Sequence, residues 1–315
     1  MSPLVAIIGP TAIGKSGLAL ELSRTFDGEI VSADSRQVYR YMDIGTAKPT
    51  HAERSLVTHH LVDVVDPDED FGLALYQRQA REAIRDVYRK GKTVFLVGGS
   101  GLYVWSLLEG WRIPSVPPDP ALRQELELRV KSEGSQALYE ELRELDMVAA
   151  QRIDPRNARR VIRALEVCRQ GGTFSGSGWK EPLVSYLAIG LTTSRAGLYA
   201  QIDDRVDGMV RQGLVDEVED LISRGYGLDL PSMSGLGYRQ IGAFCRGELD
   251  LQAAIQRIKY DTHRFARNQY SWFSLRDKRI HWFDAEEDMC RSVAELVRDF
   301  VANQDGGGSC DAQLA

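Results

Sequence analysis

One segment of the sequence has the residue types and spacing of a phosphate-binding loop. Residues 9–16, GPTAIGKS, match the pattern G-x-x-x-x-G-K-[ST] in full. Glycines at its two fixed positions allow torsions that aim consecutive backbone N–H groups into one concavity, and the lysine adds a positive charge. The serine hydroxyl suits a Mg²⁺ ion held by phosphate. We therefore predict a phosphate or diphosphate site at Gly9, Pro10, Thr11, Ala12, Ile13, Gly14, Lys15 and Ser16, with Ser16 as the metal ligand.

A second polar segment follows the next apolar run, residues 29–33. Asp34 stands directly after it, and Ser35, Arg36 and Gln37 come next. A diphosphate repels a nearby carboxylate, so a metal ion or a proton-transfer task would explain Asp34. The alternative is an aspartate that caps a helix N-terminus. The three polar neighbours suit contacts to a base edge or a phosphate.

Two further segments carry candidate groups. Residues 98–103, GGSGLY, combine small residues that permit close backbone approach with the hydroxyl of Ser100, although a tight turn explains them equally well. In residues 61–66, LVDVVD, Asp63 and Asp66 are candidates for the second acidic Mg²⁺ ligand of an NTPase. Because residues 63–70 hold five acids, a solvated acidic loop is the favoured interpretation of that run.

The elements that must position these groups alternate along the first hundred residues, which predicts a parallel α/β sheet. Strands are expected at 4–8, 29–33, 93–97 and 187–191, with a weaker one at 61–65, and helices at 15–25 and 73–90. The carboxyl ends of parallel strands share one edge, where ligands bind. The predicted fold class is α/β: a P-loop NTPase-like parallel sheet core with a mainly helical insertion.

Composition shifts suggest the domain boundaries. Four prolines lie within residues 111–120, and helical periodicity follows, with Asp-Pro pairs at 119–120 and 154–155 each expected to open a helix. We expect a core from 1–111 and 185–305, an insertion at 112–184 and a disordered tail at 306–315. Most of the chain after residue 195 reads as helical.

The 315 residues hold 39 Lys and Arg against 45 Asp and Glu, a net charge of −6, which excludes a strongly basic nucleic-acid binder. The four cysteines form no C-x-x-C pair, which excludes zinc-finger and redox motifs and favours a reducing, cytoplasmic setting. No apolar run approaches the length of a membrane span or signal peptide. We expect no membrane partner.

With these loops in hand, the chain resembles the bacterial tRNA dimethylallyltransferase (tRNA isopentenyltransferase) family. The matching blocks occur in order along nearly the whole sequence: GPTAIGKS at 9, DSRQVYRYMDIGTAKP at 34, HHLVDVVDP at 59, GGSGLY at 98, RALEV at 163, RVDGMVRQGLVDEV at 205, GLGYRQ at 235 and QYSW at 269. The order of these blocks makes the resemblance specific.

The resemblance implies a magnesium-dependent transfer from dimethylallyl diphosphate to the exocyclic amine of the adenosine 3′ of the anticodon, in tRNAs that read codons beginning with U. The phosphate loop would hold the diphosphate leaving group, with Lys15, Mg²⁺ at Ser16 and Arg205 stabilising its charge. Asp34 would take the proton of the attacking amine. Ser100 stands where the family usually has Thr and would contact the target adenosine.

The resemblance also implies where tRNA binds. Matching positions in the family that contact tRNA are, besides Asp34 and Ser100, Ser35, Arg36, Gln37, Arg123, Arg159, Arg160, Val161, Ile162 and Arg163. Residues 257–279 form a second basic region, although His263 and Asn268 replace the usual Arg; Arg264 and Arg267 lie beside them. Ile258, Phe265 and Trp272 recur every seven residues there and are expected to form its packed face. The family resemblance favours a monomer.

Two enzymatic alternatives stay open. A prenyltransferase acting on free adenine nucleotides, as in cytokinin synthesis, would need no arginine-rich insertion. A small-molecule P-loop kinase would require ATP and a metal at Asp63 or Asp66. A non-catalytic tRNA-binding protein is disfavoured because Lys15, Ser16 and Asp34 are all present.

Overall fold

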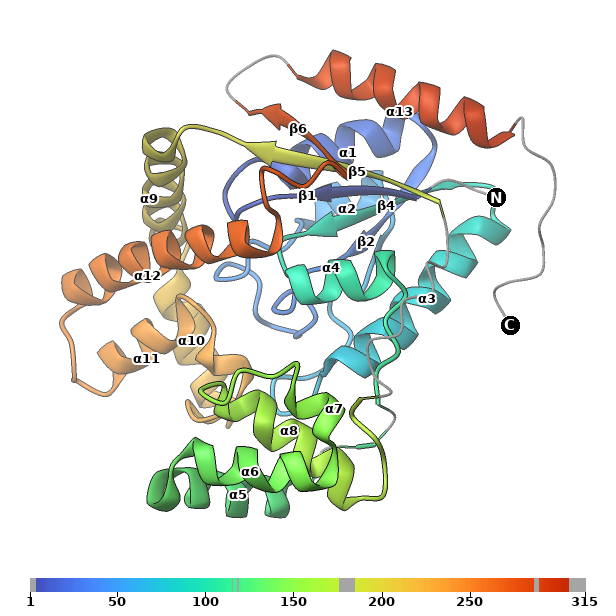
Figure 1. Cartoon of the computed structure of the whole chain (residues 1–315). Coiled ribbons are helices and arrows are strands. Elements are labelled where there is room, and N and C mark those ends of the chain that lie inside the picture. The colour runs from blue at the N-terminus through green and yellow to red at the C-terminus, as the bar shows by residue number, and fades with distance from the viewer. Residues whose placement is uncertain (1–3, 115, 118, 176–184, 286–288, 306–315) are drawn as a thin grey trace. The chain divides into compact units, whose positions relative to one another are not determined.

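The computed structural model describes residues 4–114, 116–117, 119–175, 185–285 and 289–305 (Figure 1). The chain divides into two compact units. Met1–Leu108 and Leu183–Ala315 form one, here called the sheet unit, and Glu109–Pro182 form the other, called the helical unit. The predicted disordered tail, 306–315, lies outside the described residues.

The sheet unit is built on six parallel strands in the order β3-β2-β4-β1-β5-β6. Their bounds are β1 Leu4–Ile8, β2 Gly28–Ser32, β3 His59–His60, β4 Thr93–Gly98, β5 Tyr186–Thr192 and β6 Ile280–Asp284. Every residue of β1, β2 and β4 is buried, as expected for central strands covered on both faces. The predicted α/β class is confirmed.

Helices cover both faces of this sheet. The connection from β1 to β2 through α1 (Lys15–Thr25) and the connection from β3 to β4 through α3 (Leu73–Arg89) run in opposite directions across it. Right-handed crossovers therefore place α1 and α3 on opposite faces. In Figure 1, α1 and α13 (Cys290–Asp305) lie on one side, and α3 and α4 (Gly101–Leu108) lie on the other.

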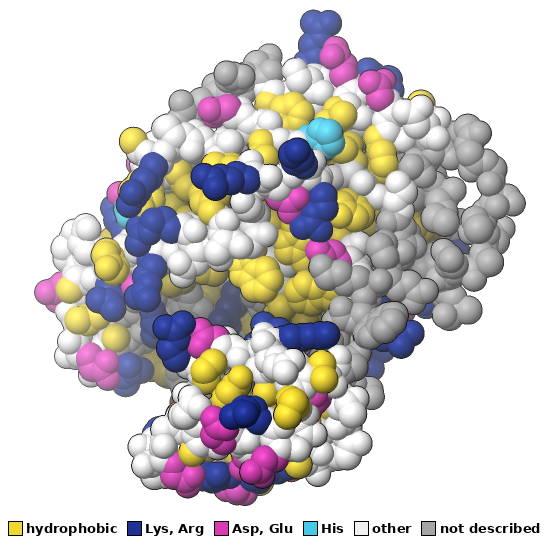
Figure 2. Space-filling view, in the orientation of Figure 1, with side chains coloured by type: hydrophobic (Ala, Val, Ile, Leu, Met, Phe, Trp, Pro, Cys, Tyr) yellow, Lys and Arg dark blue, Asp and Glu magenta, His cyan; other side chains and the backbone are white. Residues whose placement is uncertain are grey.

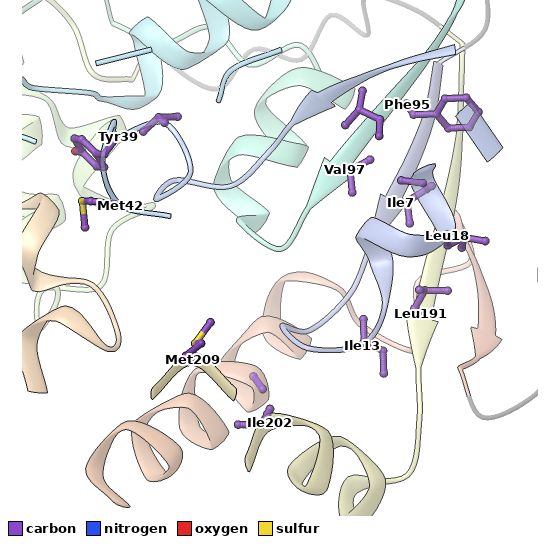
Figure 3. Packing of buried hydrophobic residues seen from close by; sticks show 14 of the residues in the cluster. Ile7, Ile13, Leu18, Tyr39, Met42, Phe95, Val97, Leu191, Ile202 and Met209 are labelled. Carbon is purple, nitrogen blue, oxygen red and sulfur yellow. The ribbon is translucent and has the colours of Figure 1, made fainter. Parts of the chain in front are cut away.

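The core lies between these layers. Ile7 of β1 is in register with Val97 of β4, and both belong to the buried cluster of Figure 3. That cluster also includes Ile13 of the phosphate loop and Ile202 of α9 (Arg195–Arg211), so apolar packing holds the loop in place. No helix in the described residues is long and apolar enough to cross a membrane.

Two strand predictions need correction. The strand expected at 61–65 is wrong: the third strand is β3, two residues earlier, because Leu61 (φ 62°) and Asp63 (φ 57°) adopt left-handed torsions that a strand does not allow. Within that stretch Val65 forms only an isolated bridge with Tyr39. The second difference is the edge strand β6. It was not predicted, and it lies after residue 195, where most of the chain was expected to be helical.

The helices after β5 wrap one end of the sheet unit. They are α9 Arg195–Arg211, α10 Leu214–Ser223, α11 Tyr238–Cys245 and α12 Leu251–Trp272, with a short 3₁₀ turn at Ser232–Ser234, and α2 (His51–Leu56) precedes β3. The predicted packed face of α12 is largely wrong. Ile258 is buried, but Phe265 and Trp272 are each 43% exposed, and the buried side chains are instead Ala254, Ile258, Asp261, Ala266 and Gln269.

The helical unit contains α5 Pro120–Glu133, α6 Ser135–Leu145, α7 Met147–Ala150 and α8 Ala158–Arg169, packed around their own apolar cluster. Asp119 caps α5 as predicted, its carboxylate accepting from the backbone N–H of Leu122 at 3.0 Å. The expected helix start at Asp154 is wrong. Asn157 caps α8 instead, by accepting from the N–H of Arg160, and Asp154 closes the preceding turn.

Candidate active site

The phosphate loop joins the end of β1 to the first turn of α1. Gly9 has φ 142°, and a Cβ there would lie 2.6 Å from the carbonyl oxygen of Leu191, so only glycine fits. Gly14 (φ 93°) and Ala12 (φ 68°) also have left-handed torsions. Ala12 is therefore strained, and strained backbone residues are often found at binding sites. The loop therefore has the backbone of an anion cradle, with Ser16 exposed in the first helical turn.

The surroundings of Lys15 act on its pKa in opposite directions. Its ammonium group donates to the carbonyl of Pro10 at 2.6 Å. Burial and the charge of Arg205 lower the pKa of Lys15 to about 7, while the carboxylate of Asp34 acts in the opposite direction. A bound anion would reverse the balance by favouring the charged form.

Arg205 reaches the same loop from α9. Its guanidinium donates to the hydroxyl of Thr11 at 3.4 Å. Burial lowers the pKa of Arg205, and Asp34 opposes that shift, but a guanidinium stays protonated at any ordinary pH. The structure thus brings together the two cations that sequence reasoning assigned to the diphosphate.

Asp34 lies at the carboxyl edge of the sheet, just after β2. Its Oδ1 accepts from the N–H of Arg36 at 2.8 Å and of Gln37 at 3.4 Å. Both hydrogen bonds use this one oxygen. No helix begins in the described residues directly after Asp34, so the carboxylate caps a turn and not a helix N-terminus, and it also lines the cavity. Ser100 lies alongside: its Oγ accepts from the N–H of Ser35 at 3.2 Å.

Arg36 and Gln37 are engaged within the protein. The guanidinium of Arg36 donates to the carbonyls of Pro231 and Ser232 and to the hydroxyl of Ser234. The Gln37 amide donates to the carbonyls of Thr46 and Ala47 and accepts from Ser32. Their side chains brace neighbouring loops, and their part in contacting RNA stays a prediction.

A single cavity of about 970 Å³ joins these groups. It is lined by the phosphate loop, the Asp34 segment, Ser100 and Arg205, together with apolar side chains from α9 and α12. The apolar lining includes Ile202, Val206, Met209, Ile258 and Phe265. The arrangement offers cations to an anion at one end, a carboxylate nearby, and an apolar wall that can exclude water.

Sequence reasoning missed three residues that hold the cavity walls. The Glu217 carboxylate accepts from the N–H groups of Asp43, Ile44 and Gly45 and from the hydroxyl of Tyr238, at 2.6–3.1 Å. Gln269 bridges the phosphate loop and the 98–100 loop. Lys48 is the third, and its side chain is only 1% exposed. Both Glu217 and Gln269 lie in blocks that match the family, RVDGMVRQGLVDEV and QYSW, but their bonds to these loops span more than 150 residues of chain, so the blocks alone do not reveal them.

The two acidic candidates for a metal ligand, Asp63 and Asp66, both form ion pairs. Its ammonium group donates to Asp43 and to Asp63, and Arg54 also pairs with Asp63. Asp66 pairs with Arg40. Although burial of Asp63 opposes it, bonding to Lys48 and Arg54 lowers the pKa of that carboxyl. In the structure, therefore, these two acids serve ion pairs.

In the helical unit, the expected tRNA-contacting positions divide into three groups. Arg159 and Arg160 are exposed. Arg123 and Arg163 both donate to the fully buried carboxylate of Glu166, at 2.8 and 3.1 Å. Val161 and Ile162 have side chains that are 0% and 5% exposed and pack in the unit's core, because α8 turns that face inward; contact of these two positions with tRNA stays a prediction.

Basic side chains gather on the surface over α9 and α12. Figure 2 shows Lys and Arg side chains gathered there. Arg267 donates to the hydroxyl of Tyr199, which also accepts from Arg195. His263 stacks on the Tyr199 ring at 4.0 Å between centroids. Arg264 is exposed and has no ion pair within the described residues.

A protein family and several known proteins match this chain over most of its length. The family model described as IPP transferase matches residues 37–278. A tRNA dimethylallyltransferase of Thermomicrobium roseum is 49% identical over 97% of both chains. One from Roseiflexus castenholzii is 54% identical over 87% of this chain and 90% of its own.

Solved structures agree. The full-length tRNA isopentenylpyrophosphate transferase from Bacillus halodurans superposes with a TM-score of 0.73 at 38% identity, covering 97% of this chain and 99% of that one. A eukaryotic dimethylallyltransferase acting on tRNA shares the fold, with a TM-score of 0.80 at 24% identity over 96% of this chain and 80% of that one. Given these matches over nearly its whole length, this chain belongs to the IPP transferase family.

Proposed function

We propose that this protein transfers the dimethylallyl group of dimethylallyl diphosphate to N6 of the adenosine 3′ of the anticodon in tRNA. The observation that carries the proposal is that Lys15, Arg205 and Asp34, from three separate segments, line one cavity at the carboxyl edge of the sheet. The pairing of an anion cradle with a carboxylate is what a diphosphate leaving group and an amine nucleophile need. Family membership supports the same reaction.

The diphosphate would be bound by residues 9–16 and the two cations. As the C1–O bond of the donor breaks, its electron pair passes to the diphosphate oxygen, where negative charge builds. Lys15 and Arg205, which line the same cavity, would stabilise that charge. The apolar residues of α9 and α12 would enclose the allyl fragment and exclude water from it.

The acceptor amine would be deprotonated by Asp34. The N6 lone pair forms the new bond to C1, and the nitrogen then carries an extra proton. With Oδ1 committed to the amides of residues 36 and 37, the carboxylate is fixed in orientation while it receives that proton. The target base must leave the anticodon stack, at a cost of a few kcal/mol.

The residues present fit a Mg²⁺ ion bound chiefly through the substrate. Ser16 is exposed in the first turn of α1, and the described residues contain no cluster of three or more His, Cys, Asp or Glu side chains suited to a metal. Such a donor set suits an ion that takes most of its oxygens from diphosphate and water. When bound, the ion would neutralise part of the leaving-group charge.

Recognition of tRNA would fall to the helical unit and to the basic surface of α9 and α12. Arg159 and Arg160 are exposed on α8 and available to phosphates. Arg123 and Arg163, held on Glu166, would present their remaining N–H donors in a fixed orientation. Charge-assisted contacts of this kind supply most of the salt-dependent affinity for RNA.

The deciding experiment supplies the purified protein with dimethylallyl diphosphate and Mg²⁺, and with unmodified tRNA, AMP or ATP as acceptor. Mass spectrometry then shows which acceptor gains the five-carbon group. The proposal expects modified tRNA only. Modification of AMP or ATP with tRNA unmodified would favour a free-nucleotide prenyltransferase, and phosphate transfer from ATP to another molecule would favour a kinase.

A further inference from the structure

Gln269, near the end of α12, joins two loops that are distant in sequence. Its Oε1 accepts from the N–H of Thr11 at 2.8 Å, and its Nε2 donates to the carbonyl of Gly99 at 2.9 Å. The side chain is 4% exposed. Each half of the amide therefore has one partner of matching polarity, and this fixes its orientation.

The fit around this amide is tight. A Cβ on Gly99 would overlap the Gln269 amide nitrogen and would lie 3.2 Å from the carbonyl oxygen of Gly9. The next turn of α12 is held to the same region, since the indole N–H of Trp105 donates to the carbonyl of Trp272 at 2.9 Å. Gly101 leaves room for the Trp272 ring. The end of α12 is thus a rigid support for this amide.

In the proposed reaction, one of these loops would bind the donor diphosphate and the other would contact the acceptor base. Thr11 lies in the phosphate loop, and its hydroxyl accepts from Arg205. Gly99 precedes Ser100, which bonds to Ser35 beside Asp34. One buried amide therefore spans the diphosphate side and the acceptor side of the cavity.

We propose that Gln269 is a positioning residue that sets the separation of donor and acceptor, an inference that rests on the proposed function. With the bridge intact, C1 of the allyl group faces the acceptor amine. Without it, the loops shift independently, and water competes for C1. The C1–O bond then breaks toward diphosphate as before, a water oxygen bonds to C1, and a proton is released, giving dimethylallyl alcohol.

Two variants test the bridge. Gln269→Met keeps the length of the side chain and removes both hydrogen bonds. Gln269→Glu restores both only when protonated, because the neutral carboxyl has one acceptor oxygen and one O–H donor. Gln256→Met, an exposed position on the same helix, is the matched control.

The measurements are the rate of transfer to tRNA, the ratio of dimethylallyl alcohol to prenylated tRNA, and the affinity for inorganic diphosphate. For Gln269→Met we expect transfer to fall by about 10- to 100-fold, the size of effect that misplaced reactants produce. The alcohol ratio should rise several-fold, while diphosphate affinity should fall less than transfer does, because Lys15 and Arg205 still line the cavity. Gln269→Glu should approach wild-type transfer as the pH falls.

Three outcomes would overturn the inference. The first is a Gln269→Met enzyme that behaves like Gln256→Met. The second is a loss of transfer with no rise in the alcohol ratio, and the third is a Gln269→Glu enzyme whose activity relative to wild type does not change with pH. Failure of the wild-type protein to prenylate tRNA would instead refute the proposed function, and the inference with it.

Discussion

Lys15 carries the charge that the cavity offers to a diphosphate, yet its surroundings in the free protein disfavour that charge. Burial and Arg205 bring its pKa to about 7, so that near neutral pH the side chain is only partly protonated. A diphosphate must raise this pKa, because an anion stabilises the charged form. Binding is therefore coupled to proton uptake.

This coupling predicts a pH dependence of diphosphate affinity. Below pH 7 Lys15 is charged before and after binding, and its contribution is complete. As the pH rises above 7, the free protein loses the proton that the complex retains, so affinity should weaken by up to about tenfold per pH unit. Titration calorimetry with inorganic diphosphate measures it. Lys15→Arg, whose charge is permanent, controls for titration of the ligand, and identical pH profiles for the two proteins would contradict the coupling.

Asp34 has two separable tasks, capping a turn through Oδ1 and accepting a proton. Asp34→Asn keeps an acceptor oxygen for the amides of Arg36 and Gln37 but removes the base. Transfer should fall by about 10²- to 10⁴-fold, the usual contribution of a general base. Gel-shift affinity for tRNA should change little. Wild-type turnover by this variant in a radiolabelled transfer assay would refute the assignment of Asp34.

Among the helices and strands, those encoded in a short stretch of sequence were predicted correctly. Those that depend on contacts between distant segments were not. The buried run of β1 followed by the phosphate loop was readable, because strand, turn and helix start are all encoded within 25 consecutive residues. The strand expected at 61–65 failed because Leu61 and Asp63 adopt left-handed torsions, and the backbone N–H of Asp63 donates to the carbonyl of Gln37 in the loop after β2. Edge strand β6 is formed by pairing with β5, a partner almost a hundred residues away.

The same reason explains which site residues were missed. Asp34 and Ser100 closely follow strand ends and Lys15 begins the helix after β1, so topology brings all three to one edge of the sheet. Glu217 and Gln269 lie on helices. Their hydrogen bonds form only when those helices pack against the loops at residues 43–45, 11 and 99. Val161 and Ile162 were assigned to tRNA contact by their match to the family, and the sequence did not reveal that helical geometry turns their side chains into the core.

Glu217 allows a test of helix α10 as a support for the cavity. Its carboxylate caps three successive N–H groups and accepts from Tyr238, so Glu217→Gln should lower the free energy of unfolding by about 1–3 kcal/mol, the typical loss of charged hydrogen bonds. Urea denaturation measures this change. Glu219→Gln, an exposed site on the same helix, should stay within about 0.5 kcal/mol of wild type. Equal stability of the two variants would remove Glu217 from the account.

For the molecule as a whole, the net charge of −6 and a polyanionic substrate are compatible because charge is distributed unevenly. Acidic side chains at 43 and 63 are consumed in ion pairs with Lys48 and Arg54. Exposed arginines remain on α8 and on α12. The distribution favours one shaped RNA substrate over general polyanion binding.

The contribution of α8 can be measured through salt. Arg160→Ala should weaken tRNA binding several-fold and reduce the slope of log affinity against log salt concentration by about one, because one phosphate contact is lost. Arg143→Ala is the matched control, since Arg143 is exposed in the same unit but pairs with Glu140. A slope that Arg160→Ala leaves unaltered would place tRNA elsewhere.

The most direct test of the central claim is to locate the transferred group within tRNA. Wild-type protein, dimethylallyl diphosphate and Mg²⁺ are incubated with a tRNA that reads a codon beginning with U, and the product is digested and sequenced by mass. We predict the five-carbon group on N6 of the adenosine 3′ of the anticodon, and no product when guanosine replaces it. Modification at another nucleotide, or prenylation of free AMP in preference to tRNA, would contradict it.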